Sequence, residues 1–205
     1  MPETRTTSPF LTERFQRAFQ LAAEVHATQL RKSTAIPYMA HVMSVAALVL
    51  ENGGSEDAAI GGLLHDAVED STDDGAVMEA RIRREFGKAV GDIVMGCSDA
   101  VAVPDQPKPP WRDRKETYLS HLRTQTNADV LLVSACDKLN NARAIVADLR
   151  DPSVGPLLWN RFSAGKDDQL WYYGRLAASY GGRVTPLLSD ELKRVVDEMR
   201  LLAGG

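Results

Sequence analysis

The chain has 205 residues, 44% of them hydrophobic and 25% charged, so it can form one well-buried core. Its net charge of −4 leaves no basic footprint for DNA or RNA, and its longest apolar run, 42–50, is too short to cross a bilayer. The first nine residues are polar and have no signal-peptide core. Cys97 and Cys136 form no CxxC pair and are expected to be reduced, buried thiols. We therefore expect a cytoplasmic protein with no nucleic acid or membrane among its partners.

Helical periodicity dominates the sequence, and no stretch shows strand-like alternation bounded by turn residues. The first predicted helix covers about 13–29, where Phe15, Phe19, Ala22 and Val25 are spaced to form one buried face. We therefore expect an all-α fold, a compact bundle of helices.

Caps and helix breakers define the remaining elements in chain order. Pro37 suits the first turn of a helix that stops at Gly53, and Ser55 caps a helix that runs to about Glu69. The proline-rich stretch 101–110 is predicted to be a loop. Further helices are predicted at about 76–86, 88–97, 112–124, 128–149, 167–180 and 187–202. The predicted organisation is a flexible N-terminus, 1–10, and a single domain, 11–205, with the C-terminal helices packed on it.

The most informative motif is the pair His65-Asp66, which follows the small, apolar run Gly61-Gly62-Leu63-Leu64. Charge at a buried position is costly unless it is paired or holds a metal. Another His, His41, lies upstream, and another Asp, Asp137, lies on an otherwise apolar helix face downstream. Together they form a mixed nitrogen and oxygen set suited to a divalent cation. Glu69 and Asp70 follow one helical turn after the His-Asp pair.

Each of these residues also has a simpler explanation when taken alone. His41 can bond to a backbone carbonyl at a helix start, Glu69 and Asp70 can form a solvated helix end, and Asp137 can pair with Arg143 or a lysine. Together these explanations require several unrelated polar residues at buried positions, so the combination favours a metal centre.

These motifs resemble those of the HD-domain metal phosphohydrolases. Within them the chain is most similar to the hydrolase domain of the RelA/SpoT family and its stand-alone small alarmone hydrolases. The matching stretches occur in family order at 26–32, 37–41, 63–70, 86–87, 114–115 and 137–143.

The resemblance implies a helical bundle that holds a metal, usually manganese, through the residues matching His41, His65, Asp66 and Asp137. Glu69 and Asp70 match the pair that activates or orients the attacking water. Nucleotide-contacting positions match Arg31, Lys32, Lys138 and Asn141. The implied reaction is removal of the 3′-pyrophosphate from ppGpp or pppGpp.

The chain departs from the family pattern in places. The loop after Lys32 reads Ser33-Thr34-Ala35-Ile36, where the family often has a Gly. Trp171, Tyr172 and Tyr173 have no family counterpart and are expected to pack the C-terminal helices onto the core, with Trp111 as a better candidate for the rim of a site. Two alternatives stay open: an HD phosphohydrolase acting on another nucleotide or phosphoester, and a non-catalytic nucleotide sensor. The sequence does not indicate the oligomeric state.

Overall fold

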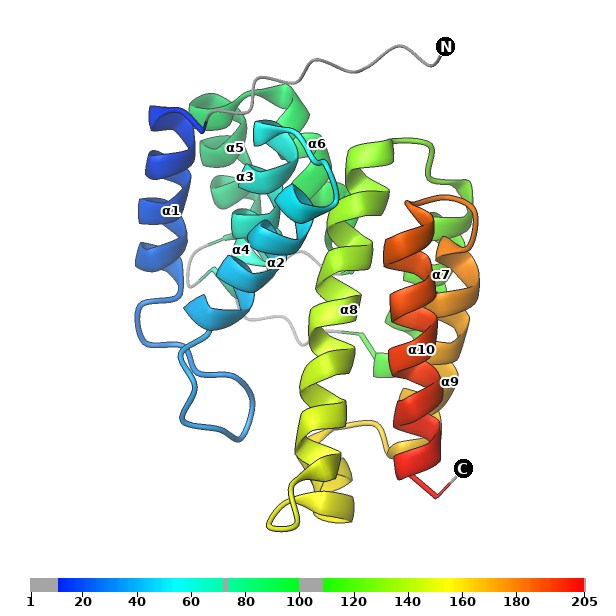
Figure 1. Cartoon of the computed structure of the whole chain (residues 1–205). Helices are drawn as coiled ribbons and strands as arrows, with labels where there is room; N and C mark the ends of the chain where they lie inside the picture. The colour runs from blue at the N-terminus through cyan, green and yellow to red at the C-terminus, as the bar shows by residue number, and fades with distance from the viewer. Residues whose placement is uncertain (1–10, 72–73, 100–108, 205) are drawn as a thin grey trace.

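The computed structural model describes residues 11–71, 74–99 and 109–204, and every regular element within these ranges is helical (Figure 1). The all-α prediction is therefore confirmed, whereas the predictions for 1–10 and for most of 101–110 lie outside the described residues. In this described part, no helix is long and apolar enough to cross a membrane. The helices are α1 (Glu13–Val25), α2 (Met39–Glu51), α3 (Glu56–Leu64), α4 (Ala67–Asp70), α5 (Gly75–Phe86), α6 (Lys88–Cys97), α7 (Trp111–Thr124), α8 (Ala128–Arg150), the 3₁₀ helix η1 (Gly155–Arg161), α9 (Lys166–Tyr180) and α10 (Pro186–Leu202).

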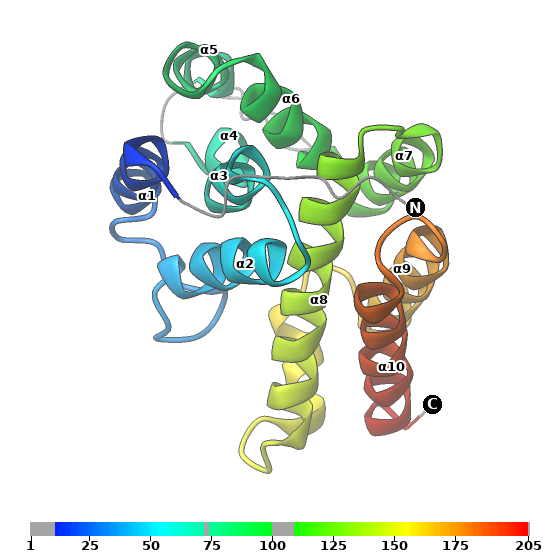
Figure 2. The ribbon, with the colours of Figure 1, turned by 45° about the horizontal axis from the view of Figure 1, so that its top comes forward.

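The long helix α8 runs through the middle of the molecule and separates two groups of helices (Figures 1 and 2). On one side it packs against α2, α3 and α6, and on the other it packs against α9, α10 and η1. Residues on different faces of α8 therefore meet elements that are far apart in the sequence.

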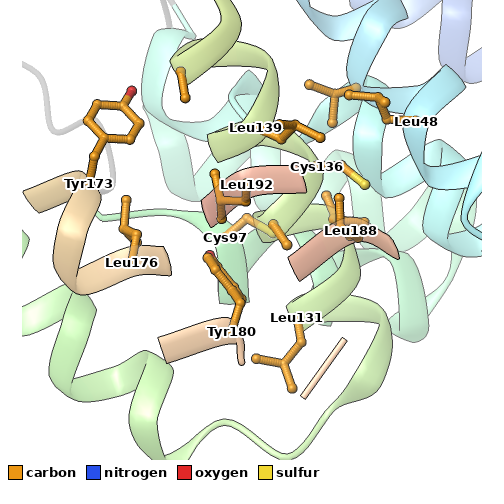
Figure 3. Packing of buried hydrophobic residues seen from close by; sticks show 14 of the residues in the cluster. Leu48, Cys97, Leu131, Cys136, Leu139, Tyr173, Leu176, Tyr180, Leu188 and Leu192 are labelled. Carbon is orange, nitrogen blue, oxygen red and sulfur yellow. The ribbon is translucent and has the colours of Figure 1, made fainter. Parts of the chain in front are cut away.

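The buried hydrophobic residues form two clusters, and the second of them includes residues from both sides of α8. One lies among α1–α6 and includes the fully buried Leu21, Ile60 and Ile82. The other surrounds α8 and includes Leu139, with side chains of α9 and α10 packed around it (Figure 3). Cys97 and Cys136 are buried, free thiols in this second cluster, as expected.

Most predicted helices are confirmed, but the first one differs in length and in its buried face. Helix α1 ends at Val25 and not near Gln29, and Phe19 is 39% exposed. Its buried residues are Ala18, Leu21 and Ala22, and the two alanines allow α1 to pack closely on α3, whereas the predicted Phe15 and Val25 are only partly buried.

The predicted helix 55–69 is also wrong in one respect, because it is interrupted at the His-Asp pair. Helix α3 ends at Leu64, His65 is its C-cap, and Asp66 is the N-cap of α4 with φ −97° and ψ −5°. This turn lets two consecutive side chains point to the same place, whereas neighbours in a continuous helix would diverge by about 100°.

Candidate metal centre and adjoining cavity

Four predicted ligands converge where α2, the α3–α4 junction and α8 meet. The His41 and His65 Nε2 atoms lie 3.3 Å apart. Asp66 Oδ2 lies 3.0 Å from His65 Nε2 and 3.6 Å from His41 Nε2. Asp137 Oδ1 lies 3.3 Å from His41 Nε2 and 3.6 Å from His65 Nε2. His41, His65 and Asp137 thus form a group whose ligand atoms all lie within 4.8 Å of one another, and Asp66 Oδ2 lies beside this group, within 3.6 Å of both imidazoles.

These separations fit a shared cation. Ligands that each lie about 2.0–2.2 Å from a metal are roughly 3.0–3.6 Å from their neighbours around it. The far ring nitrogens agree with this, because His41 Nδ1 lies 2.7 Å from Asn140 Oδ1 and His65 Nδ1 lies 2.9 Å from the Gly62 carbonyl oxygen. Both partners are acceptors, so each Nδ1 donates its proton, and Nε2 is the atom of each imidazole that would coordinate a metal.

The electrostatics of the cluster also favour a positive charge at this point. Burial by itself lowers the pKa of both imidazoles, but the Asp66 and Asp137 carboxylates outweigh it and raise the pKa of His41 and His65. Burial raises the pKa of the two carboxyls, yet His65 near Asp66 and Lys138 near Asp137 hold each pKa well below its usual range. Both Asp side chains are therefore ionised and available as ligands.

Further side chains, which the sequence motifs did not single out, hold these ligands in place. The Tyr38 hydroxyl donates to Asp66 Oδ2 at 2.5 Å. Asn140 Oδ1 also accepts from Arg31 Nη1 at 3.1 Å, so this one oxygen links Arg31 to His41. Tyr38 and Asn140 both lie inside the matching stretches 37–41 and 137–143, and only that position could have indicated them.

The predicted substrate-binding residues gather beside the same cluster. Arg31 Nη2 donates to Asn141 Oδ1 at 3.0 Å, and Asn141 Nδ2 donates to Asp137 Oδ1 at 2.6 Å. The largely buried Lys138 ammonium pairs with the Asp137 carboxylate of its own helix. Lys32 is exposed, and the next residue, Ser33, has φ +58°, a backbone conformation that Gly adopts more readily than Ser.

Glu69 and Asp70 lie on α4, one turn beyond Asp66. Gln29 Nε2 donates to Asp70 Oδ2 at 2.9 Å, and the Gln29 amide oxygen lies 2.6 Å from Nδ1 of the buried His26. Glu69 Oε1 accepts from the backbone N–H of Asp99 at 2.7 Å. Both carboxylates are thus oriented by contacts with other segments and are not a simple solvated helix end.

A cavity of about 320 Å³ adjoins the ligand cluster and is lined by all four predicted substrate-binding residues. Tyr38, Lys138 and Asn141 connect the two, because each lines the cavity and also bonds to Asp66 or Asp137. The remaining lining residues come from the 31–34 loop, α7, α8, η1, α9 and their connections: Thr34, Trp111, Lys115, Ala144, Ile145, Asp148, Leu158, Arg161, Phe162, Gln169, Tyr172 and Tyr173.

The aromatic residues have more than one role. Tyr172 and Tyr173 are buried in the core, as predicted, but they also line this cavity. Trp111 lines it too and meets the Tyr172 ring edge-on at 5.7 Å. Trp171 lines a different hollow, with Arg112 stacked 3.3 Å above its ring. The core prediction for α9 is confirmed for both tyrosines, and their second role depends on tertiary contacts that no local pattern shows.

Residues 18–155, which are more than half of the chain, match the HD domain family. The chain belongs to it. Among curated relatives it is similar to a probable GTP pyrophosphokinase of Mycobacterium leprae, at 33% identity over 132 residues, which are 63% of this chain and 16% of that protein. It is also similar to the guanosine-3′,5′-bis(diphosphate) 3′-pyrophosphohydrolase of Aquifex aeolicus, at 31% identity over 67% of this chain and 18% of that protein. The chain thus spans less than a fifth of each relative.

Two solved structures share the fold over most of the chain. A metazoan orthologue of SpoT that hydrolyses ppGpp matches with a TM-score of 0.68 and 21% identity, covering 95% of this chain and 98% of that one. A protein from Listeria monocytogenes matches with a TM-score of 0.63 and 28% identity, covering 80% of this chain and 99% of that one. Both likenesses extend beyond the matched family region.

Proposed function

We propose that this chain is a metal-dependent nucleotide pyrophosphohydrolase that removes the 3′-pyrophosphate from ppGpp or pppGpp and yields GDP or GTP. The observation that carries the proposal is the convergence of His41, His65, Asp66 and Asp137 beside a cavity rich in cationic side chains. The substrate is suggested by the named activity of the Aquifex aeolicus relative.

In this proposal the four converging side chains hold a divalent cation, with manganese as the first candidate. When bound, such a cation lowers the pKa of a coordinated water and draws charge from a phosphate oxygen. The mixed imidazole and carboxylate donors suit several divalent ions, so the preference for manganese rests on the family resemblance. The buried, unpaired cysteines are in keeping with a proposed location in the reducing cytoplasm.

Glu69 and Asp70 are the proposed proton-transfer and water-orienting groups. The oxygen of water forms a bond to the phosphorus next to the 3′ oxygen of the ribose, and the bond between that phosphorus and the 3′ oxygen breaks. One carboxylate accepts a proton from the water, and a proton is delivered to the 3′ oxygen as pyrophosphate leaves. The Gln29 contact with Asp70 and the Asp99 contact with Glu69 support this role, because they orient both carboxylates.

Arg31, Lys32, Lys138 and Asn141 are the proposed contacts to the nucleotide. Phosphoryl transfer depends mainly on positioning and charge stabilisation, and cations in the cavity wall supply both. Arg31 is pre-positioned by its bonds to Asn140 and Asn141, whereas the exposed Lys32 is placed to meet phosphate at the rim.

A substrate panel with purified protein and manganese tests the proposal. We expect pyrophosphate to be released from ppGpp and pppGpp, and His65→Ala to abolish the release because it removes a proposed ligand. If ppGpp and pppGpp are inert while another nucleotide or phosphoester is hydrolysed at the same centre, the proposed substrate is wrong. If no substrate is hydrolysed but nucleotides bind, the chain is a sensor and the enzymatic proposal fails.

A further inference from the structure

One carboxylate stands out in the wall of the cavity. The described lining residues include five cationic side chains, those of Arg31, Lys32, Lys115, Lys138 and Arg161. Asp148 is the single acidic side chain among them. A carboxylate repels phosphate, so its presence in a cavity for a polyphosphorylated ligand needs a separate explanation.

Asp148 lies well away from the metal ligands along the same face of α8. It follows Asp137 by three helical turns, which corresponds to about 16 Å along the axis with nearly the same angular position. Asn141, Ala144 and Ile145 lie between them on this face and also line the cavity. This distance leaves room for a ribose and a purine base between the proposed metal and Asp148.

The Asp148 carboxylate is oriented but keeps free hydrogen-bonding capacity. Arg161 Nη1 donates to Asp148 Oδ2 at 2.9 Å, and no described residue donates to Oδ1. The side chain of Asp148 is 35% exposed. An ionised carboxylate is acceptor-only, with several lone pairs on its two oxygens, so it can still receive two N–H donors from a ligand.

We propose that Asp148 selects guanine by accepting hydrogen bonds from its N1–H and its 2-amino group. Guanine presents these two donors side by side. Adenine has no proton on N1, and hypoxanthine, the base of inosine, lacks the 2-amino group. Arg161 acts as a positioning residue that holds the carboxylate toward the base. The inference rests on the proposed function, because it assigns the base end of the same substrate.

Base preference measured on matched nucleotides tests this assignment. The wild-type protein should hydrolyse the 3′-pyrophosphorylated guanosine nucleotide with a kcat/KM roughly 10- to 100-fold above that of the inosine analogue, which lacks one donor to a charged acceptor. In Asp148→Asn the guanosine-to-inosine ratio should fall to within a few-fold of one. The same comparison is made by calorimetry with GDP and IDP, which needs no turnover.

Glu198→Gln is the matched control, because Glu198, like Asp148, pairs with an arginine, in its case Arg150, but is not part of the cavity lining. It should retain the wild-type ratio. An unchanged ratio in Asp148→Asn, or a wild-type protein with no preference for guanosine over inosine, would overturn the inference. If no 3′-pyrophosphorylated nucleotide is hydrolysed, the proposed function fails, and the GDP-to-IDP binding ratio still decides the role of Asp148.

Discussion

At the scale of single residues, the neutral side chain of Asn140 contacts both a proposed metal ligand and a cationic residue of the cavity. Its Oδ1 accepts from His41 Nδ1, which orients the imidazole, and the same oxygen accepts from Arg31, which holds the guanidinium in the cavity wall. Asn140→Ala should weaken manganese binding about 10- to 100-fold, the usual cost of losing such support for a ligand. Metal titration of the purified variant measures this.

The control for that prediction is Asn160→Ala, since Asn160 is exposed on η1. It should bind the metal as the wild type does. Equal affinity in both variants would show that His41 needs no support from α8.

Glu69 and Asp70 allow chemistry to be separated from metal binding. Glu69→Gln and Asp70→Asn keep the size of each side chain and remove its ability to take up a proton. Each variant should keep the metal and the fold but lose about 10²- to 10⁴-fold in kcat, the range typical of a missing general acid or base. Single-turnover rates with metal analysis check this, and wild-type rates in both variants would remove the pair from the mechanism.

At the scale of elements, α3, which ends at the His-Asp pair, packs closely on α6. A Cβ added to Gly61 would lie 2.4 Å from Ile93 Cγ2, and this methyl group belongs to a β-branched side chain that is stiff in a helix. Gly61→Ala should therefore destabilise the protein by about 1–3 kcal/mol through overpacking. Urea unfolding measures the change.

A second glycine serves as the control for this steric argument. A Cβ at Gly181 would meet only Ala178 O, at 3.7 Å, and Gly181 has no positive φ. Gly181→Ala should change the unfolding free energy by well under 1 kcal/mol. A similar loss in both variants would mean that the effect comes from helix propensity or caps and not from the α3–α6 contact.

The elements also show which parts of the fold were predictable. Helix starts and stops followed local signals, such as the Ser55 cap whose Oγ accepts from Ala58 N–H, and Gly87 with φ +92° after α5. The helix break at His65-Asp66 is not marked by a Gly or a Pro in the sequence, so only the structure reveals it. The proposed ligands could be named from the sequence because buried charge is costly wherever the chain folds, and three of them, His41, His65 and Asp137, lie together in one group. The cavity wall was not predictable in the same way, because it combines α7, α8, η1 and α9, whose proximity depends on tertiary packing.

At the scale of the whole molecule, Asp99 joins the end of α6 to α7 and α4. Its buried carboxylate pairs with Arg114 at 2.6 Å and with Lys115 on α7, near Lys138 on α8, while its own N–H bonds to Glu69 on α4. Burial raises the pKa of Asp99, but these cations outweigh it and hold the pKa below its usual value. The unfolded chain therefore takes up this proton at a higher pH than the folded one does.

The stabilisation from Asp99 is consequently present above its unfolded pKa of about 3.9 and is lost as the pH falls below that value. Asp99→Asn should be less stable than the wild type at pH 7 and should lose less stability between pH 5 and pH 3. Unfolding free energies across this range measure the slope. The exposed Asp190→Asn should keep the wild-type slope, and an equally steep Asp99→Asn profile would assign the acid sensitivity to other groups.

The proposed metal centre also lies between the two halves of the molecule. His41, His65 and Asp66 come from elements on the α1–α6 side, whereas Asp137 belongs to α8, around which the second hydrophobic cluster is built.

A ligand that binds only the folded state stabilises it by about 2.7 kcal/mol at a concentration 100-fold above its Kd. For a chain of this length that corresponds to a rise in Tm of roughly 5–10 °C. Manganese should therefore raise the Tm above the value measured with a chelator, and Asp137→Ala should no longer show this rise. The control, Glu191→Gln, breaks an exposed pair with Arg143 and should keep the rise. Identical melting curves in manganese and in chelator would show that these four side chains do not hold the ion.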